Sequence, residues 1–176
     1  MLGMVLGRVV LMRRHGIEAL NFGKIDKSDF LILPFALFYF YIVIANAFNF
    51  ISVTTQELFH SETVAWIGVI FCIGGLLLII WSLISFGQSF RIGIDLDNPD
   101  QLITSGVFAY SRNPIYVAFA MILFGQFLIF SNWILLSYFG AALWLFHRQV
   151  LREEDYLKVH YGKEYSEYCY HVRRYF

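Results

Sequence analysis

Two apolar segments without a single charge constrain this chain more than any other feature of its sequence. They cover residues 30–50 and 64–86. Because a helix rises about 1.5 Å per residue, roughly 20 residues are enough to cross the hydrocarbon core of a bilayer, which is about 30 Å thick. Both segments reach that length, so each is predicted to be a transmembrane helix.

The composition agrees with a membrane environment. Hydrophobic residues make up 59% of the 176 residues, and charged residues only 15%. A small soluble core cannot hide so much apolar surface. The chain is therefore predicted to be an all-α integral membrane protein.

Two shorter apolar runs, residues 115–130 and 133–146, follow closely on one another. Only Ser131 and Asn132 separate them, which predicts a tight helical hairpin. Each arm crosses the bilayer if it borrows flanking residues at its polar end, and the alternative is a re-entrant hairpin that reaches only part of the way. With both arms crossing, the fold has about four transmembrane helices.

The distribution of basic residues predicts the orientation. Every lysine and arginine lies before the first run, between the second and third, or after the fourth. The loop between the first two runs contains Glu57 and Glu62 but no basic residue. Because positively charged loops stay on the cytoplasmic side, we expect a multi-pass protein with both termini and its active site on that side.

The chain divides into three parts of one membrane domain. Residues 1–28 form a cytoplasmic or interfacial segment, which is either an interfacial helix or a partial extra span. Residues 29–86 hold the first two transmembrane helices. Residues 87–176 hold a polar loop at the membrane surface, the helical hairpin and a helical cytoplasmic tail.

Several classes of function are disfavoured. The basic residues are interleaved with acids and no nucleic-acid recognition module is visible. No CxxC or CxxH spacing suggests a metal. Cys72 lies in a predicted span and Cys169 in the tail, so a disulfide is not expected.

The hairpin begins with the sequence SRNPIY, residues 111–116. Pro114 suits the first turn of a helix, where its missing N–H costs nothing. The free N–H groups of that turn carry a partial positive charge beside Arg112, which predicts an anion at this place. The alternative is that Arg112 only anchors the helix at lipid phosphates.

The second arm of the hairpin is predicted to continue into the tail as one helix. At 100° per residue, Leu143, Val150, Glu154 and Leu157 share one apolar stripe. A carboxylate in such a stripe needs a cation or hydrogen-bond donors. Glu154 either forms a salt bridge with Arg112 or another basic residue, or faces a polar ligand that it shares with Arg112.

Structural roles are expected for the other polar residues of this region. Glu153 points away from Glu154, toward the side of Gln149 and Tyr156. At least two of the tail tyrosines are expected to pack the tail onto the membrane face, and two histidines to be structural or interfacial. These residues are Tyr161, Tyr165 and Tyr168, and His147 and His160.

Two long motifs in the second half of the chain resemble a known family. They are LITSGVFAYSRNPIY and, after the hairpin, REEDYLKVHYGKEYSEYCYHVRRYF. In this order they are similar to the isoprenylcysteine carboxyl methyltransferase and phospholipid methyltransferase group of integral membrane enzymes. The family pattern is Gly-x-aromatic, Arg-His-Pro-x-Tyr, two spans, Glu-Glu, then Gly-x-x-Tyr-x-x-Tyr.

The resemblance implies S-adenosylmethionine bound at the cytoplasmic face, between a cofactor-binding loop that begins at residue 87, the last two spans and the catalytic tail. It also implies a lipid substrate that enters from the bilayer. It carries the catalytic roles to Arg112, Tyr116 and Glu154. The residues that it implies in cofactor binding are Gly106, Arg112, Asn113, Pro114, Tyr116, Glu153 and Glu154. The chain departs from the family at Asn113, which replaces a histidine and removes any imidazole proton transfer, and at Arg173, which stands where many relatives have proline.

The expected function is methyl transfer from S-adenosylmethionine to a carboxylate, amine or thiol on a lipidic acceptor. Arg112 and the helix start would bind the cofactor carboxylate or orient an acceptor carboxylate, and Glu154 would hold the ammonium group or ribose hydroxyls. Tyr116 lines the pocket or belongs to the interfacial aromatic belt. We expect no metal and no nucleic acid, and a monomer or small homo-oligomer. The alternatives are a nicotinamide-dependent reductase similar to sterol reductases, and a non-enzymatic membrane scaffold.

Overall fold

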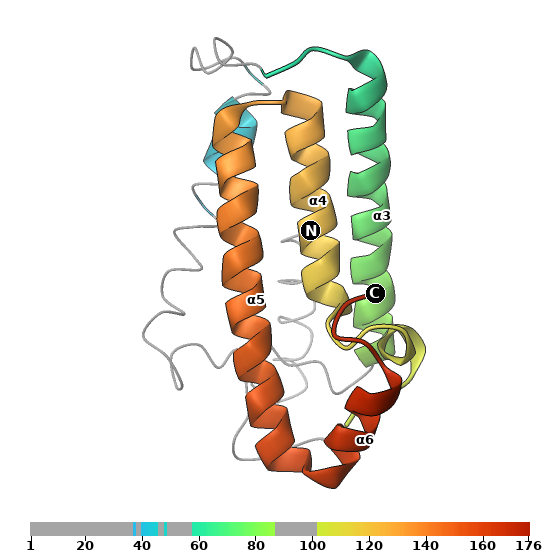
Figure 1. Ribbon diagram of the computed structural model, residues 1–176. Coiled ribbons are helices and arrows are strands. Elements are labelled where there is room, and N and C mark those ends of the chain that lie inside the picture. Colours follow the sequence, from blue (N-terminus) through green and yellow to red (C-terminus); the bar gives the residue numbers. More distant parts are fainter. Residues whose placement is uncertain (1–36, 38–39, 46–47, 49–57, 87–101) are drawn as a thin grey trace, which may run out of the picture.

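The structure is a computed structural model that describes residues 37, 40–45, 48, 58–86 and 102–176. These residues are mostly helical and contain no strand. The named elements are α3 (Glu62–Phe86), the 3-10 helix η4 (Gly106–Ala109), α4 (Pro114–Phe130), α5 (Trp133–Tyr161) and α6 (Lys163–His171). Figure 1 shows α3, α4 and α5 as three long rods, with α6 and the chain end at one end of them.

The hairpin predicted for the second half of the chain is confirmed, because Ser131 and Asn132 join α4 to α5. Ser131 ends α4 in the left-handed region with φ 34°, which allows the sharp turn. The side chain of Asn132 accepts a hydrogen bond from the Leu135 backbone N–H at 2.8 Å and caps α5. The cap supplies a partner that the first turn of a helix cannot supply itself.

The α3–α4 seam is the row of small residues along which these two helices meet. A Cβ atom added to Gly68 would lie 2.5 Å from the Gly125 carbonyl oxygen, and one added to Gly125 would lie 2.5 Å from the Gly68 carbonyl oxygen. Two turns further along, a Cβ on Gly75 would lie 2.8 Å from the Ala118 carbonyl oxygen. Close backbone approach through small residues is typical of helix pairs in membranes. The buried apolar cluster beside it contains Ile79, Leu83, Ala118 and Ile122.

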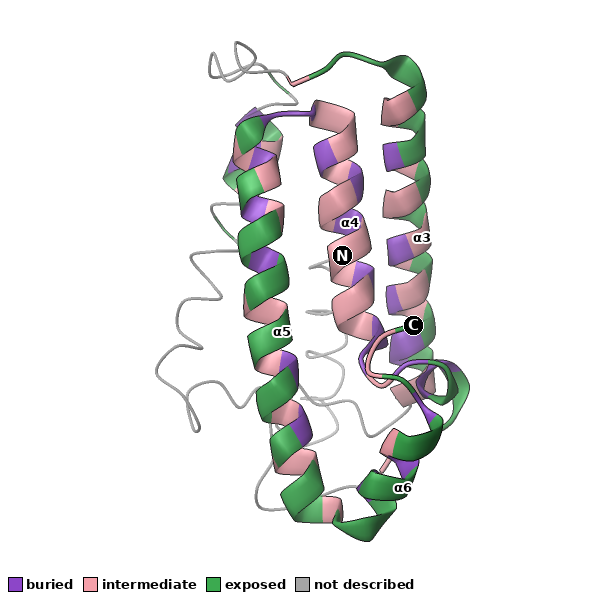
Figure 2. Ribbon diagram, in the orientation of Figure 1, coloured by how far each residue is buried: buried purple, intermediate pink, exposed green. Residues whose placement is uncertain are grey.

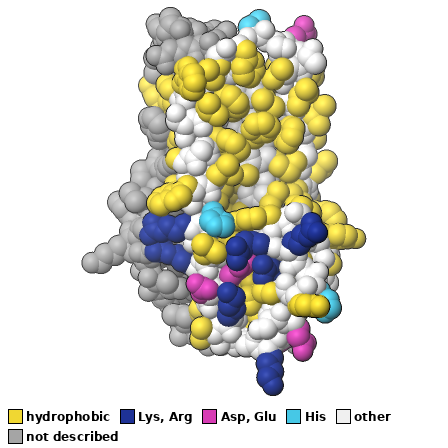
Figure 3. Space-filling view, viewed as in Figure 1, with side chains coloured by type: hydrophobic (Ala, Val, Ile, Leu, Met, Phe, Trp, Pro, Cys, Tyr) yellow, Lys and Arg dark blue, Asp and Glu magenta, His cyan; other side chains and the backbone are white. Residues whose placement is uncertain are grey.

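The outward surface of α3 is apolar and exposed. Trp66, Ile70 and Ile84 are each more than 60% exposed, and Figure 2 shows α3 green along its outer side. In Figure 3, hydrophobic side chains cover much of the upper half of the visible face. Such a continuous apolar surface is stable in lipid, where apolar side chains need no burial in protein.

Two described helices, α3 and α5, are long and apolar enough to cross a membrane, and α4 is a shorter apolar helix of 17 residues. These findings agree with a helical membrane protein. The predicted span at residues 30–50 lies mostly outside the described residues, as do residues 1–28. Within it, residues 40–45 are helical, and Ile42 packs against Phe127, Leu135 and Tyr138.

The continuation of α5 into the tail as one helix is confirmed, since it runs for 29 residues. It ends at Gly162, whose φ of 53° turns the chain into α6. The face of α6 with Tyr165 and Tyr168 packs with Val172 into a small core. Two of the tail tyrosines thus pack inside the protein, and the packing of the tail onto the membrane face stays a prediction. The chain then returns to the start of α4 (Figure 1).

Candidate active site

Glu154 is the centre of a buried ionic cluster. Its side chain is only 2% exposed. Arg112 Nη2 lies 3.3 Å from Oε1, and Arg174 Nη2 and Nε lie 2.8 and 2.9 Å from Oε2. Asn113 Nδ2 also donates to Oε1 at 3.4 Å. The predicted salt bridge between Glu154 and Arg112 is therefore confirmed, with a second arginine that the sequence did not single out.

Two helix positions bring this cluster together. Arg112 and Asn113 directly precede Pro114, which occupies the first turn of α4 as predicted. Glu154 lies one helical turn after the fully buried Val150 on the inward side of α5. The start of one hairpin arm thus faces the continuation of the other.

The apolar stripe predicted along α5 is buried only in part. Leu143 is 41% exposed, whereas the buried side of α5 passes through Leu135, Tyr138 and Ala142 before it reaches Val150. In a span whose lipid-facing side is as apolar as its protein-facing side, periodicity cannot tell the two sides apart. The inference for Glu154 survived because a polar residue is informative where apolar ones are not.

The end of the chain closes over the start of α4, and we call residues 172–176 the strap. The Arg112 backbone N–H donates to the Arg173 carbonyl at 3.0 Å, and Asn113 Nδ2 donates to the Arg174 carbonyl at 3.2 Å. The Tyr175 hydroxyl lies 2.9 Å from His147 Nδ1. His147 thus has the structural role expected of it. Apart from the basic pair in HVRRYF, no sequence pattern indicates these backbone contacts.

Two buried donors in this region have no hydrogen-bond partner among the described residues. They are Arg112 Nε and the Tyr165 hydroxyl. Tyr165 is 1% exposed, and the Cys169 thiol lies close enough to raise the pKa of its hydroxyl. Arg112 Nη1 contacts Cys169 Sγ. Because a buried donor without a partner is costly, these two groups indicate a place for a polar ligand.

Arg174 and three tyrosines around the cluster keep their protons. The hydrogen bond to Glu154 raises the pKa of Arg174 above its ordinary value. Burial is the main cause that raises the pKa of Tyr165, Tyr168 and Tyr175. The tyrosine hydroxyls of this region are therefore neutral donors at physiological pH.

Tyr116 and Glu153 form a second polar contact between α4 and α5. The Tyr116 hydroxyl donates to Glu153 Oε1 at 2.6 Å, and Gln149 Nε2 donates to the same oxygen at 3.2 Å. This confirms that Glu153 points toward Gln149 and that the Tyr116 hydroxyl reaches a partner. The Tyr116 ring lies 5.7 Å from the ring of Phe146, so this contact borders the apolar part of the hairpin.

Gly106 packs η4 against the end of α3. Its φ is 64°, and an added Cβ would collide with the Ser85 side chain. The next residue, Val107, donates its backbone N–H to Ser85 Oγ at 3.1 Å. The carbonyl of Phe108 accepts a hydrogen bond from the Tyr168 hydroxyl at 2.6 Å. Among the sequence-predicted site residues, the structure brings Arg112, Asn113 and Glu154 into the ionic cluster and places Gly106 in this supporting contact.

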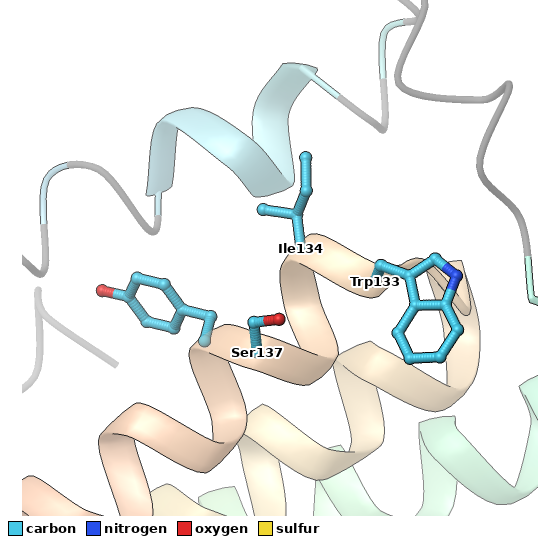
Figure 4. A pocket seen from close by; sticks show the side chains of 4 residues that line it. Trp133, Ile134 and Ser137 are labelled. Atoms are coloured by element: carbon cyan, nitrogen blue, oxygen red, sulfur yellow. The ribbon is translucent and has the colours of Figure 1, made fainter.

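An open apolar pocket lies at the opposite end of α5 (Figure 4). It has a volume of about 410 Å³ and is lined by Trp133, Ile134, Ser137 and Tyr138. No charged side chain lines it, so it offers none of the chemistry of the ionic cluster. In the described part of the chain, no group of three or more His, Cys, Asp or Glu residues is arranged to hold a metal ion.

The fold and the ionic cluster define a helical membrane protein with a polar site at one end of its helices. The family model for phospholipid methyltransferases matches residues 63–164. This range includes α3, α4, α5 and the residues Arg112, Tyr116, Glu153 and Glu154. The chain therefore belongs to the phospholipid methyltransferase family.

Individual relatives are named for one methylation reaction. The chain is 34% identical over 90 residues to the protein-S-isoprenylcysteine O-methyltransferase of Schizosaccharomyces pombe, which covers 49% of this chain and 38% of that protein. It is 28% identical to a probable enzyme of the same name from indica rice over 72% of this chain and 71% of the rice protein. For the rat enzyme the values are 27%, 86% and 55%. The chain thus spans only part of each relative's length.

A solved structure has the same fold. It is the eukaryotic intramembrane Ras methyltransferase called isoprenylcysteine carboxyl methyltransferase, which matches with a TM-score of 0.65 over 93% of this chain and 57% of that one. The sequence identity is 19%. The match confirms the membrane methyltransferase fold that the sequence motifs predict.

Proposed function

We propose that this protein transfers a methyl group from S-adenosylmethionine to a nucleophile on a lipid-linked acceptor, at the cytoplasmic face of a membrane. The observation that carries the proposal is the ionic cluster at Glu154 with its two unpartnered buried donors. Membership of a methyltransferase family supports it. The bias of basic residues toward this end of the molecule supports a cytoplasmic site.

The cluster residues fit the charged end of an amino-acid cofactor. The unpartnered Arg112 Nε can donate to a carboxylate, while Glu154 and the Tyr165 hydroxyl can meet an ammonium group or hydroxyls. Arg112 and Glu154 pair with each other in this structure. A bound amino-acid group would offer its carboxylate to Arg112 and its ammonium group to Glu154. When bound, S-adenosylmethionine supplies a methyl group on a sulfonium, and the electron pair of the broken S–C bond remains on sulfur.

The acceptor proposed is a carboxylate at the end of an apolar chain. The relatives are named for O-methylation of isoprenylcysteine, and a carboxylate is a nucleophile without loss of a proton. Asn113 stands where an imidazole would be expected, so this position holds no proton acceptor of that kind. It instead donates to Glu154 and to the strap. In this reaction the chain's residues position and dehydrate the reactants, because opposite charges cancel best in a water-poor site.

The first test is the thermal stability of detergent-purified protein with S-adenosylhomocysteine. A ligand that binds only the native state raises its stability by RT ln(1 + [L]/Kd), about 2.7 kcal/mol at a hundredfold excess over Kd. We expect this shift in the wild type and its loss in Arg112→Ala and Glu154→Gln. The matched control is Asp155→Asn, because Asp155 is the exposed neighbour of Glu154.

Two outcomes would contradict the proposal. No stabilisation of the folded wild type at saturating S-adenosylhomocysteine would remove the methyltransferase function. Stabilisation by NADPH instead would favour the reductase alternative. If neither compound stabilises the protein and Glu154→Gln leaves it unchanged in every assay, the scaffold alternative remains.

A further inference from the structure

Arg174 uses only one edge of its guanidinium group within the described part of the chain. Its Nε donates to Glu154 Oε2, and its Nη2 forms an ion pair with the same oxygen. No hydrogen bond of Nη1 is found there. The Arg174 side chain is 35% exposed, whereas that of Arg112 is 11% exposed. Of the two arginines at Glu154, Arg174 therefore keeps an accessible edge with free N–H groups.

The charge of the cluster favours an anion at that edge. Two guanidinium groups face the single carboxylate of Glu154, which leaves one positive charge. The hydrogen bond to Glu154 also raises the pKa of Arg174, so Arg174 stays charged throughout the physiological range. One further monoanion would neutralise the cluster, and a guanidinium edge matches the two coplanar oxygens of a carboxylate.

The position of Arg174 suits a molecule whose tail lies in the bilayer. The strap holds it at the start of α4, through the bond from Asn113 Nδ2 to the Arg174 carbonyl. Its neighbour Tyr175 contacts His147, and His147 lies about one helical turn after the exposed apolar residues Leu143 and Trp144 of α5. In Figure 3, basic side chains gather just below the hydrophobic surface. Arg174 thus stands at the border between apolar surface and charge.

We infer that Arg174 is the specificity-determining residue for the acceptor, and that its free edge binds a carboxylate at the end of an apolar chain. This inference rests on the proposed function, and it assigns different ligands to the two arginines of the cluster. The enclosed Arg112 serves the cofactor side, and Arg174 serves the acceptor side. An acceptor with a neutral head group would leave the edge unpaired and would bind more weakly.

The test compares two probes that differ only in charge, N-acetyl-S-farnesylcysteine and its carboxamide. Their binding is measured by thermal shift and by competition, in phosphatidylcholine nanodiscs, with S-adenosylhomocysteine present. The variants are Arg174→Gln and Arg174→Lys, with Lys163→Gln as an exposed control that makes the same change of charge on α6. A glutamine at position 174 can still donate one hydrogen bond to Glu154, which protects the fold.

In Arg174→Gln we expect the carboxylate to bind about ten- to a hundredfold more weakly, which is the usual range for loss of one charge-assisted hydrogen-bonded pair. The carboxamide should bind equally to the variant and the wild type, and stabilisation by S-adenosylhomocysteine should persist. Arg174→Lys keeps the charge but lacks the planar edges with which a guanidinium group can bind two carboxylates at once. Its affinity for the acceptor carboxylate should therefore be intermediate. Lys163→Gln should match the wild type.

Three results would overturn the inference. Equal loss of both probes in Arg174→Gln would make Arg174 merely structural. Loss of the S-adenosylhomocysteine shift in that variant would place Arg174 on the cofactor side. If phosphatidylglycerol nanodiscs stabilise the wild type more than Arg174→Gln while carboxylate binding is unchanged, the edge binds lipid phosphate. A wild type that S-adenosylhomocysteine does not stabilise would instead defeat the proposed function itself.

Discussion

The helix pairs α3–α4 and α4–α5 are joined by opposite means. Along the α3–α4 seam, Gly68 and Gly125 let the two backbones approach until a single added methyl group would collide. Between α4 and α5, aromatic rings keep the helices apart, as Phe124 and Phe139 do with ring centroids 5.4 Å from each other. At the end with the ionic cluster, α5 runs on past the start of α4, and α6 and the strap bring the chain back to that start (Figure 1).

This difference separates scaffold from site. A seam of backbone against backbone leaves no room for a ligand and fixes the position of α4. The wider α4–α5 pair holds charged and hydroxyl-bearing side chains instead, including Glu154, Arg112 and Tyr116. A rigid pair thus supports one wall of the polar site, and long side chains form the other, which is a favourable arrangement for holding a ligand in a fixed geometry.

The largest effect should come from breaking the polar end. Glu154→Ala leaves two guanidinium groups facing each other without their carboxylate, and loss of one partner of a buried pair typically costs about 3–5 kcal/mol. Arg174 is partly exposed, which places the expected loss at the lower end of that range. The measurement is thermal unfolding of the purified protein followed by tryptophan fluorescence.

The neighbouring pair Asp155 and Lys158 provides the control. Their side chains are 78% and 53% exposed and lie 3.4 Å apart, so Asp155→Ala should change stability by less than about 0.5 kcal/mol. Similar losses in the two alanine variants would show that the Glu154 cluster is held no more tightly than a surface pair.

The seam should respond next, to a single methyl group. In Gly125→Ala the new Cβ would lie 2.5 Å from the Gly68 carbonyl oxygen and 2.7 Å from Cys72 Sγ. Because backbone blocks one side, the helices must move apart, and overpacking of this kind costs about 1–3 kcal/mol. The matched control is Gly140→Ala on α5, where nothing lies within 4 Å of the added Cβ. That variant should be stabilised by about 0.5–1 kcal/mol, and equal destabilisation of both would argue against the seam.

The smallest effects should come from two tyrosines of α6 and should have opposite signs. The Tyr168 hydroxyl donates to the Phe108 carbonyl, so Tyr168→Phe should destabilise the protein by about 0.5–1.5 kcal/mol. The Tyr165 hydroxyl is buried without a partner among the described residues, so Tyr165→Phe should stabilise the ligand-free protein by about 1 kcal/mol.

Binding of S-adenosylhomocysteine distinguishes the two tyrosines further. If the Tyr165 hydroxyl serves the ligand, Tyr165→Phe should show a smaller ligand-induced thermal shift than the wild type although its ligand-free form is more stable. Tyr168→Phe should keep the full shift. A loss of stability in ligand-free Tyr165→Phe would mean that its hydroxyl already has a partner.

The parts of the fold that the sequence could predict are those in which polar residues interrupt apolar ones. Ser131 and Asn132 marked the hairpin turn, Pro114 marked the start of α4, and Glu154 marked the inward side of α5. Each is a residue type that lipid disfavours or a regular helix rejects, so its place in the structure is restricted.

Other features could not be predicted, for physical reasons. The exposure of Leu143 could not be predicted, because lipid and protein interior accept the same apolar side chains. The strap was missed because two of its main contacts use the backbone carbonyls of Arg173 and Arg174, and every residue has such a carbonyl. The role of Arg174 at Glu154 depends on that path, so it was also invisible in the sequence.

The same backbone contacts have an evolutionary consequence. Because the carbonyls at positions 173 and 174 hold the strap in register, the path of the chain does not depend on those two side chains alone. Mutation can therefore sample new head-group preferences at position 174 without rebuilding the wall of the site. Laboratory selection for new acceptors has its natural starting point in this one codon.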